Sequence, residues 1–143
     1  MIAIGCDHGG YELKLFLMKH LDEKSISYKD FGCNSTDSCD YPEYGHAVGK
    51  AVASGECEKG IVICSTGIGI SIAANKVRGV RAAICTNSLM ARLTREHNDS
   101  NVLALGAYIL GPQLAADIMD TFLSTEFSNG ERHVRRVGDI ENV

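Results

Sequence analysis

The sequence is poor in several features that mark specialised classes of protein. It has no tryptophan and two prolines among 143 residues, and no apolar run approaches the roughly 20 residues that cross a membrane. It also lacks an excess of positive charge, because 14 lysines and arginines stand against 18 aspartates and glutamates, for a formal net charge of -4. We therefore expect no membrane span, and neither nucleic acid nor an acidic membrane surface as the main partner.

The sequence also lacks the usual spacings of metal ligands and disulfide motifs. Its six cysteines include no Cys-x-x-Cys pair, and its histidines and cysteines do not follow a metal-ligand pattern. The first residues, MIAIGCDHGG, have no basic segment ahead of the apolar one, so we expect no signal peptide. Cysteines within apolar segments then indicate reduced thiols. We predict no metal site and a cytoplasmic location.

What the sequence does contain is a regular alternation of apolar runs and amphipathic stretches. Without linkers, repeats or low-complexity segments, its length suits a single domain over 1–143. The alternation predicts class α/β, a three-layer αβα sandwich with a five-stranded parallel, Rossmann-like sheet. The predicted strands are 1–6, 27–32, 61–64, 80–85 and 102–106, the predicted helices are 11–24, 44–52, 70–76, 88–97 and 112–123, a polar loop is expected at 33–44, and a basic tail at 132–136.

The most informative stretch is 60–76, GIVICSTGIGISIAANK, which joins a buried strand, a glycine turn and a helix start. Gly67 and Gly69 permit a tight turn, and the unpaired N–H groups and dipole of the helix start can hold an anion. Cys64 ends the strand at the rim of this hole. It is either a reactive thiol facing an anionic substrate or a small buried apolar residue. A Cys-x5-Arg phosphatase loop is not expected, because Ile70 stands where the arginine would be.

Three more residues fall at the same edge of the predicted sheet. Asp7 and His8 follow the first strand, and Thr66 lies in the glycine turn. Ligands of parallel sheets bind outside the C-terminal ends of the strands, so these side chains and Cys64 should converge. Taken alone, Asp7 can equally be a helix cap.

The second half of the chain adds a histidine and a basic segment. His97 ends a predicted helix, where a surface histidine is favoured by the helix dipole. Arg132 and Arg136 are either a solvated patch or, in an acidic protein, a grip for phosphate.

These residues lie in motifs that together match one family. The chain resembles ribose-5-phosphate isomerase type B, of the group that also contains the galactose-6-phosphate isomerase subunits. The resemblance runs almost from end to end, through GCDHGG near the start, DYP at 40–42, ICSTGIGISIAANKVRGVRAA at 63–83, REHNDSNVLALG at 95–106 and RHVRRV at 132–137. It implies interconversion of an aldose phosphate and its ketose through an enediol(ate), without metal or organic cofactor.

The resemblance also implies roles for individual residues. Cys64 is expected to be the base that moves a proton between C1 and C2, assisted by Thr66. His97 is expected to open the sugar ring, with Asp7 nearby. The remaining residues are expected to bind substrate. The amides around Gly67 to Gly69, with Ile68 between them, are expected to hold the enediolate oxygens. Ser65 and Thr66 are also expected to contact the substrate, Asn98 to bind the sugar, and His8, Arg132 and Arg136 to bind the phosphate.

Two residues depart from the family pattern. Ser65 replaces a usual glycine, and Tyr108 stands where the family usually has an arginine on the phosphate. Another sugar phosphate, allose 6-phosphate or galactose 6-phosphate, therefore stays open as the substrate. A flavodoxin-like module that only binds a phosphorylated ligand is the alternative outside enzymes.

The order of the elements further predicts a site shared by two chains. His97 precedes the strand 102–106, so it should lie at the N-terminal edge of the sheet, opposite Cys64. A two-fold homodimer would bring His97 of each chain to the other's Cys64. The family resemblance also points to a homodimer, and pairing of dimers into a tetramer stays open.

Overall fold

Five parallel strands form one sheet in the order β2-β1-β3-β5-β4 in the computed structural model, which describes residues 1–143. This confirms the predicted α/β class and the parallel sheet. The strands are β1 (Ile2–Cys6), β2 (Tyr28–Asp30), β3 (Lys59–Cys64), β4 (Ala82–Ile84) and β5 (Val102–Gly106). The helices are α1 (Tyr11–Glu23), α2 (Tyr41–Ala53), α3 (Ile68–Asn75), α4 (Ser88–Asn98), α5 (Pro112–Ser124) and α6 (Glu131–Glu141), and a short 3-10 helix, η1 (His8–Gly10), precedes α1.

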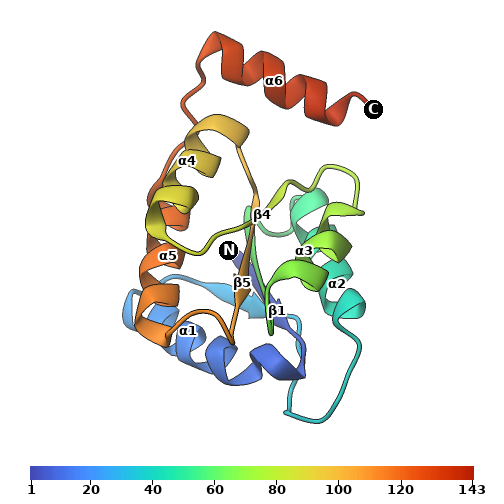
Figure 1. The fold of residues 1–143 in the computed structure, drawn as a ribbon, viewed down its shortest axis with the longest axis vertical. Coiled ribbons are helices and arrows are strands. Elements are labelled where there is room, and N and C mark those ends of the chain that lie inside the picture. The colour runs from blue at the N-terminus through green and yellow to red at the C-terminus, as the bar shows by residue number, and fades with distance from the viewer.

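Helices cover both faces of the sheet. Figure 1 shows α1, α4 and α5 on one side of the strands, α2 and α3 on the other, and α6 at one end of the molecule. None of the helices combines the length and the apolar character needed to span a bilayer.

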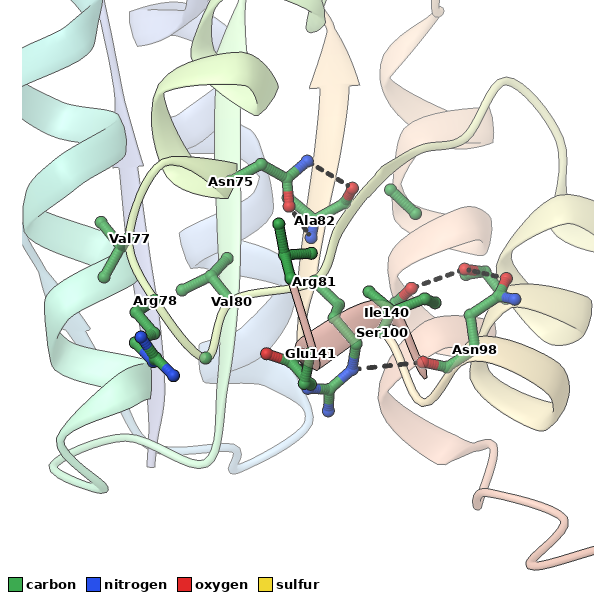
Figure 2. Close-up of a pocket in the computed structure, with 14 residues that line it drawn as sticks. Asn75, Val77, Arg78, Val80, Arg81, Ala82, Asn98, Ser100, Ile140 and Glu141 are labelled. Atoms are coloured by element: carbon green, nitrogen blue, oxygen red, sulfur yellow. Dashed lines mark hydrogen bonds and ion pairs between the residues drawn. The ribbon is translucent and has the colours of Figure 1, made fainter. Parts of the chain in front are cut away.

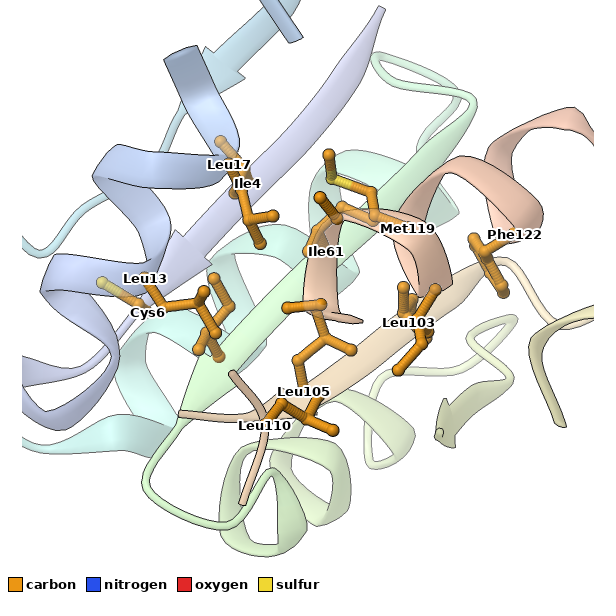
Figure 3. Close-up of a cluster of buried hydrophobic side chains, with 14 of the residues drawn as sticks. Ile4, Cys6, Leu13, Leu17, Ile61, Leu103, Leu105, Leu110, Met119 and Phe122 are labelled. Carbon is orange, nitrogen blue, oxygen red and sulfur yellow. The ribbon is translucent and has the colours of Figure 1, made fainter. Parts of the chain in front are cut away.

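The strand β3 shows why both faces are apolar. Ile61 and Ile63 pack with the helices α1 and α5, in the cluster drawn in Figure 3. Val62 and Cys64 point to the opposite face and pack with α2 and α3. Successive residues of a strand alternate between faces, so a central strand covered on both sides must be apolar throughout. As a result, the Cys64 side chain lies on the face that carries α3.

Two helices differ from the prediction. The helix α2 begins at Tyr41, three residues earlier than expected, because Pro42 fits the first helical turn, where its missing N–H costs nothing. The basic segment at 132–136 is part of the helix α6 and is not an extended tail. Because α6 is rich in charged residues, the sequence did not indicate its apolar stripe, which includes Val134 and Ile140. Both side chains are half-exposed in the single chain.

A partly buried ion pair joins α1 to the edge strand β2. The Lys14 side chain is fully buried. Its Nζ donates to Asp30 Oδ1 at 2.7 Å and to the carbonyl oxygen of Cys33. A charge can be buried when such partners replace its water, and these partners belong to segments distant in sequence. Lys14 thereby secures the start of the 33–40 loop, which lies beside the candidate site.

Candidate active site

The turn between β3 and α3 holds the thiol of Cys64 against the start of the helix. Gly67 has a φ of 79° and is the N-cap residue of α3. Its N–H donates to Cys64 Sγ at 3.2 Å, and Cys64 is only 5% exposed. A Cβ at Gly67 would lie 3.0 Å from the carbonyl carbon of Leu105, so both the conformation and the space require glycine. The sulfur is therefore held in one place at the C-terminal edge of the sheet.

The hydrogen bonds of the turn decide which amides remain for a ligand. The Ile68 N–H donates to Thr66 Oγ1 at 3.1 Å, while the Gly67 N–H is directed at the sulfur. The N–H groups of Gly69 and Ile70 have no hydrogen-bond partner in the chain, as expected for the first turn of a helix. Of the amides predicted to form the anion hole, Gly69 is thus free, and Ile70 adds a donor that the sequence analysis did not include.

The loop after β5 is hydrogen-bonded to the turn between β3 and α3. The N–H of Ala107 donates to the carbonyl of Cys64, and the N–H of Tyr108 donates to that of Ser65, both at 2.9 Å. Ser65 also contacts the loop after β1, where a Cβ on Gly9 would lie 2.5 Å from Ser65 Oγ. The departure from the usual glycine at Ser65 is thus accommodated by the absence of a side chain at Gly9.

Asp7 and His8 lie beside this turn, as the strand order β1-β3 requires. The Asp7 N–H donates to the carbonyl of Ile63, and Asp7 Oδ1 accepts from the N–H of Gly10 at 3.1 Å. Asp7 therefore does cap the short helix η1, and its Oδ2 has no hydrogen-bond partner in the chain. His8 Nδ1 accepts from the N–H of Cys39 at 3.2 Å, so a neutral His8 carries its proton on Nε2, where it can be donated to a ligand.

Two tyrosines near the turn were not predicted as site residues. The ring of Tyr41 lies against Gly69, since a Cβ there would come within 2.7 Å of it. The motif Asp40-Tyr41-Pro42 was a signal for it, because it combines a helix start with an aromatic residue. Tyr108 was noted as a departure from the family, and its side chain is 76% exposed beside the turn.

The other predicted residues form a separate group around the end of α4. The rings of His97 and His133 have centroids 4.6 Å apart, with 34° between their planes. Asn98 Oδ1 accepts from Thr94 Oγ1 at 3.1 Å, and Asn98 also lines the cavity of about 700 Å³ drawn in Figure 2. Arg132 and Arg136 are exposed on α6.

The two groups lie at opposite ends of the sheet. The register pairs Gly60 with Val102 and Cys64 with Gly106, so the length of β3 separates the Cys64 turn from the end of α4. Four residues of a strand span about 13 Å. In Figure 1, α6 lies at one end of the molecule and β5 runs away from it towards the other. None of the four cavities of the chain is lined by Cys64, Thr66 or His97.

Two of the other cysteines are kept protonated by burial. All six are free thiols. Burial raises the pKa of Cys6 to about 12 and that of Cys85 to about 11. A thiol with such a pKa holds its proton at neutral pH and cannot serve as a base. No group of three or more His, Cys, Asp or Glu residues lies close enough together to hold a metal ion.

The fold and the turn define an α/β protein whose parallel sheet presents a thiol next to free amides of a helix start. A family model described as ribose/galactose isomerase matches residues 2–140. The chain belongs to this family, which confirms the resemblance predicted from its motifs.

Individual relatives agree with this assignment. Ribose-5-phosphate isomerase B of Escherichia coli is 48% identical over 142 residues, which cover 99% of this chain and 95% of the relative. The solved structure of Clostridium thermocellum ribose-5-phosphate isomerase B is 57% identical, with a TM-score of 0.97, over 99% of this chain and 95% of that one. A Thermotoga maritima ribose 5-phosphate isomerase structure is 47% identical, with a TM-score of 0.96, over 99% and 97% of the two chains.

Proposed function

We propose that this chain is an aldose–ketose isomerase that interconverts ribose 5-phosphate and ribulose 5-phosphate through an enediol(ate). The observation that carries the proposal is the Cys64 thiol held by the Gly67 N–H, beside the free amides of Gly69 and Ile70. Removing a proton next to a carbonyl needs a base and donors for the oxyanion that develops. One turn supplies both, and relatives of the same length carry this activity in their names.

In the proposed reaction, the Cys64 thiolate takes the proton from C2 of the open-chain aldose. The C2–H electron pair forms the C1–C2 double bond, and the negative charge moves to O1, where the Gly69 and Ile70 N–H groups stabilise it. The C2 hydroxyl then gives its proton to O1, and its O–H electron pair forms the C2 ketone. The C1–C2 double-bond pair takes the proton back from the thiol at C1. Thr66 Oγ1, at the mouth of the turn, assists by holding the Ile68 amide. The electrons stay within the substrate, so the reaction requires no organic cofactor.

Before this step, the sugar ring must open. Opening breaks the bond between C1 and the ring oxygen, removes a proton from the O1 hydroxyl and adds one to the ring oxygen. We assign this acid–base step to His97, with Asp7 nearby in the shared site, where its Oδ2 is not used by the Gly10 N–H. Asn98 would bind the sugar through its Nδ2, because its Oδ1 is occupied by Thr94.

We assign the phosphate to His8, Arg132 and Arg136. The Nε2–H of His8 is oriented by the Cys39 N–H, which occupies Nδ1. Guanidinium groups bind phosphate through paired donors, so two arginines spaced one helical turn apart on α6 suit this ligand.

The proposed site requires two chains, because its halves lie at opposite ends of one sheet. A two-fold homodimer would place His97 and α6 of each chain over the Cys64 turn of the other. Exposed apolar residues support such an interface: Ile68 and Ile72 on α3 and Leu89 and Met90 at the start of α4 are all more than two-fifths exposed. We further propose that the enzyme is a single domain of residues 1–143 in the cytoplasm, which agrees with six free cysteines.

Tyr108 supports a second candidate substrate within the same reaction. It replaces the usual arginine and lines, with Gly9 and Lys19, a cavity of about 660 Å³ beside the turn. A 6-phosphate of allose or galactose is one carbon longer and would place its phosphate differently. The function would then be isomerisation of a hexose phosphate by the same residues.

A panel of sugar phosphates tests the proposed function. Ribose 5-phosphate, allose 6-phosphate and galactose 6-phosphate would each be incubated with the enzyme in D2O and followed by NMR. We expect the fastest isomerisation, with deuterium entering at the exchanged carbon, for ribose 5-phosphate. A faster hexose phosphate would select the second candidate. Binding of any of them without C–H exchange would identify a non-catalytic module.

The variant Tyr108→Arg tests the phosphate site directly. We expect it to lower the KM for ribose 5-phosphate by about 3–10-fold, because a charge-assisted contact is added at an exposed position where solvent weakens it. Steady-state kinetics at two salt concentrations would show the gain shrinking as salt rises. Tyr108→Phe is the matched control, with no expected change. An unchanged or higher KM for the arginine variant would mean that this pocket does not hold the phosphate.

A further inference from the structure

The helix α6 is held to the rest of the chain by very few groups. His133 is its only buried residue, with 8% of the side chain exposed. At the other end of the helix, Glu141 Oε1 forms an ion pair with Arg81 Nη1 at 2.7 Å. The attachment of the first turn of α6 to α4 therefore depends on one imidazole.

That imidazole is braced on two sides. One side stacks on the ring of His97, with the 4.6 Å centroid separation given above. On the other, His133 Nδ1 lies 2.7 Å from Ser128 Oγ. Ser128 is itself fixed, because its N–H donates to the carbonyl of Glu96 and its Oγ accepts from the N–H of Gly130. The ring of His133 is thus tied back to the residue that precedes His97.

His97, in contrast, has little else to hold it. Its side chain is exposed at the end of α4, and its ring forms no hydrogen bond within the chain. An exposed histidine samples several rotamers, and acid–base catalysis loses rate when its group is misplaced by about 1 Å. The stacked ring of His133 is the contact that restricts it.

Burial, more than the neighbouring charges, favours the neutral form of His133. Burial, with smaller effects from Arg132, His97 and Arg136, lowers the pKa of His133 below its usual value, and Glu96 opposes this. A neutral ring can remain stacked on His97 while His97 gains and loses a proton during ring opening. A lysine or arginine at this place would repel that proton.

We propose that His133 is a positioning residue that holds the His97 ring in the orientation needed for opening the sugar ring. This inference rests on the proposed function, in which His97 performs that step. His133 itself touches no reacting atom and acts only through His97 and Ser128.

Ribose 5-phosphate and ribulose 5-phosphate differ in whether a ring must open, so comparing them can distinguish a positioning role of His133 from a general effect on the stability of the site. Ribose 5-phosphate is mostly a closed ring, so its isomerisation needs both ring opening and proton transfer. Ribulose 5-phosphate cannot close a five-membered ring, because its O5 carries the phosphate. Exchange of a C1 proton of ribulose 5-phosphate with D2O therefore requires only Cys64 and the anion hole. Both rates can be followed by NMR on the same protein.

We expect His133→Ala to lower the rate of ribose 5-phosphate isomerisation by about 100-fold, while C1 exchange of ribulose 5-phosphate stays within about three-fold of wild type. His97→Ala should show the same split. His133→Phe keeps a ring against His97 but loses the bond to Ser128, so it should recover about ten-fold over alanine. Ser128→Ala, which keeps the imidazole but removes its bond to Ser128 Oγ together with the bond from the Gly130 N–H, should lose about as much as His133→Phe. His20→Ala, on α1 and paired with Asp120, is the control and should change neither rate.

Several results would overturn the inference. A parallel loss of both rates in His133→Ala would mean that His133 supports the phosphate site or α6 as a whole. Unchanged isomerisation, or a phenylalanine variant no better than alanine, would remove the positioning role. If His133→Ala does not fold, the Phe and Ser128→Ala variants provide the same comparison. Failure of the proposed function is distinguishable, because wild type would then not isomerise or His97→Ala would show no split.

Discussion

Replacing Cys64 with alanine is expected to lower isomerisation of ribose 5-phosphate by about 10³-fold, within the range typical for loss of a general base. The loss should appear equally in C1 exchange of ribulose 5-phosphate, because both reactions need the proton acceptor. Substrate binding should persist, since the amides of Gly69 and Ile70 and the phosphate ligands are unchanged. The measurements are initial rates by NMR and the affinity for ribose 5-phosphate by calorimetry.

Cys57→Ala provides a matched control for Cys64→Ala. Both cysteines are buried in the cluster between the sheet and the helices α2 and α3. Each substitution removes one sulfur from that cluster and should cost about 1 kcal/mol of unfolding free energy. Cys57→Ala should nevertheless retain wild-type rates. If Cys64→Ala kept more than half of the wild-type activity, the base would have to be another group.

Mixing two inactive variants is expected to restore activity. Cys64→Ala subunits retain His97, and His97→Ala subunits retain Cys64, so a mixed dimer contains one complete shared site and one lacking both groups. Random exchange makes half of the dimers mixed, and each has one working site of two. The mixture should therefore reach about a quarter of the wild-type isomerisation rate per subunit, against nearly none for either variant alone.

The mixed dimers must be detected directly, so that an absence of activity can be distinguished from an absence of subunit exchange. Subunits carrying tags of different mass can be counted by native mass spectrometry before the rate is measured. Activity should rise in proportion to the mixed fraction. Mixed dimers without activity would mean that Cys64 and His97 serve the same chain's site, and the shared site would be falsified.

Several elements followed from local sequence alone. The run before Cys64 is apolar at every position, which suits a strand covered on both faces, and Gly67 occupies a conformation that disfavours other residues. Asn87 caps α4 by accepting from the N–H of Met90, and Pro112 stands in the first turn of α5, which are positions typical of these residue types. In each case the signal and the structure lie within a few residues of each other.

The errors came from segments whose structure depends on distant contacts. α6 was interpreted as a tail because of its run of basic residues, and the contact of its His133 with His97 appears only in the packing on α4. The burial of Lys14 was likewise not predicted. A helical stripe shows which residues are apolar, but not that Asp30 and the Cys33 carbonyl oxygen lie within hydrogen-bond distance of the Lys14 Nζ. The position of Tyr41 against Gly69 likewise joins segments that no local pattern connects.

The sequence by itself determined the succession along the chain of the five strands and of the helices α1 to α5, the glycine turn beside Cys64 and, through its motifs, the ribose/galactose isomerase family. Backbone conformation and amphipathic period are local properties, so neighbouring residues suffice to specify them. Only the tertiary structure decided which amides of the turn stay free, how His8 is oriented by Cys39, and that His97 rests on His133. Those features depend on side chains brought together by packing across the sheet, and hydrogen-bond partners far apart in the chain are chosen only when the core has formed.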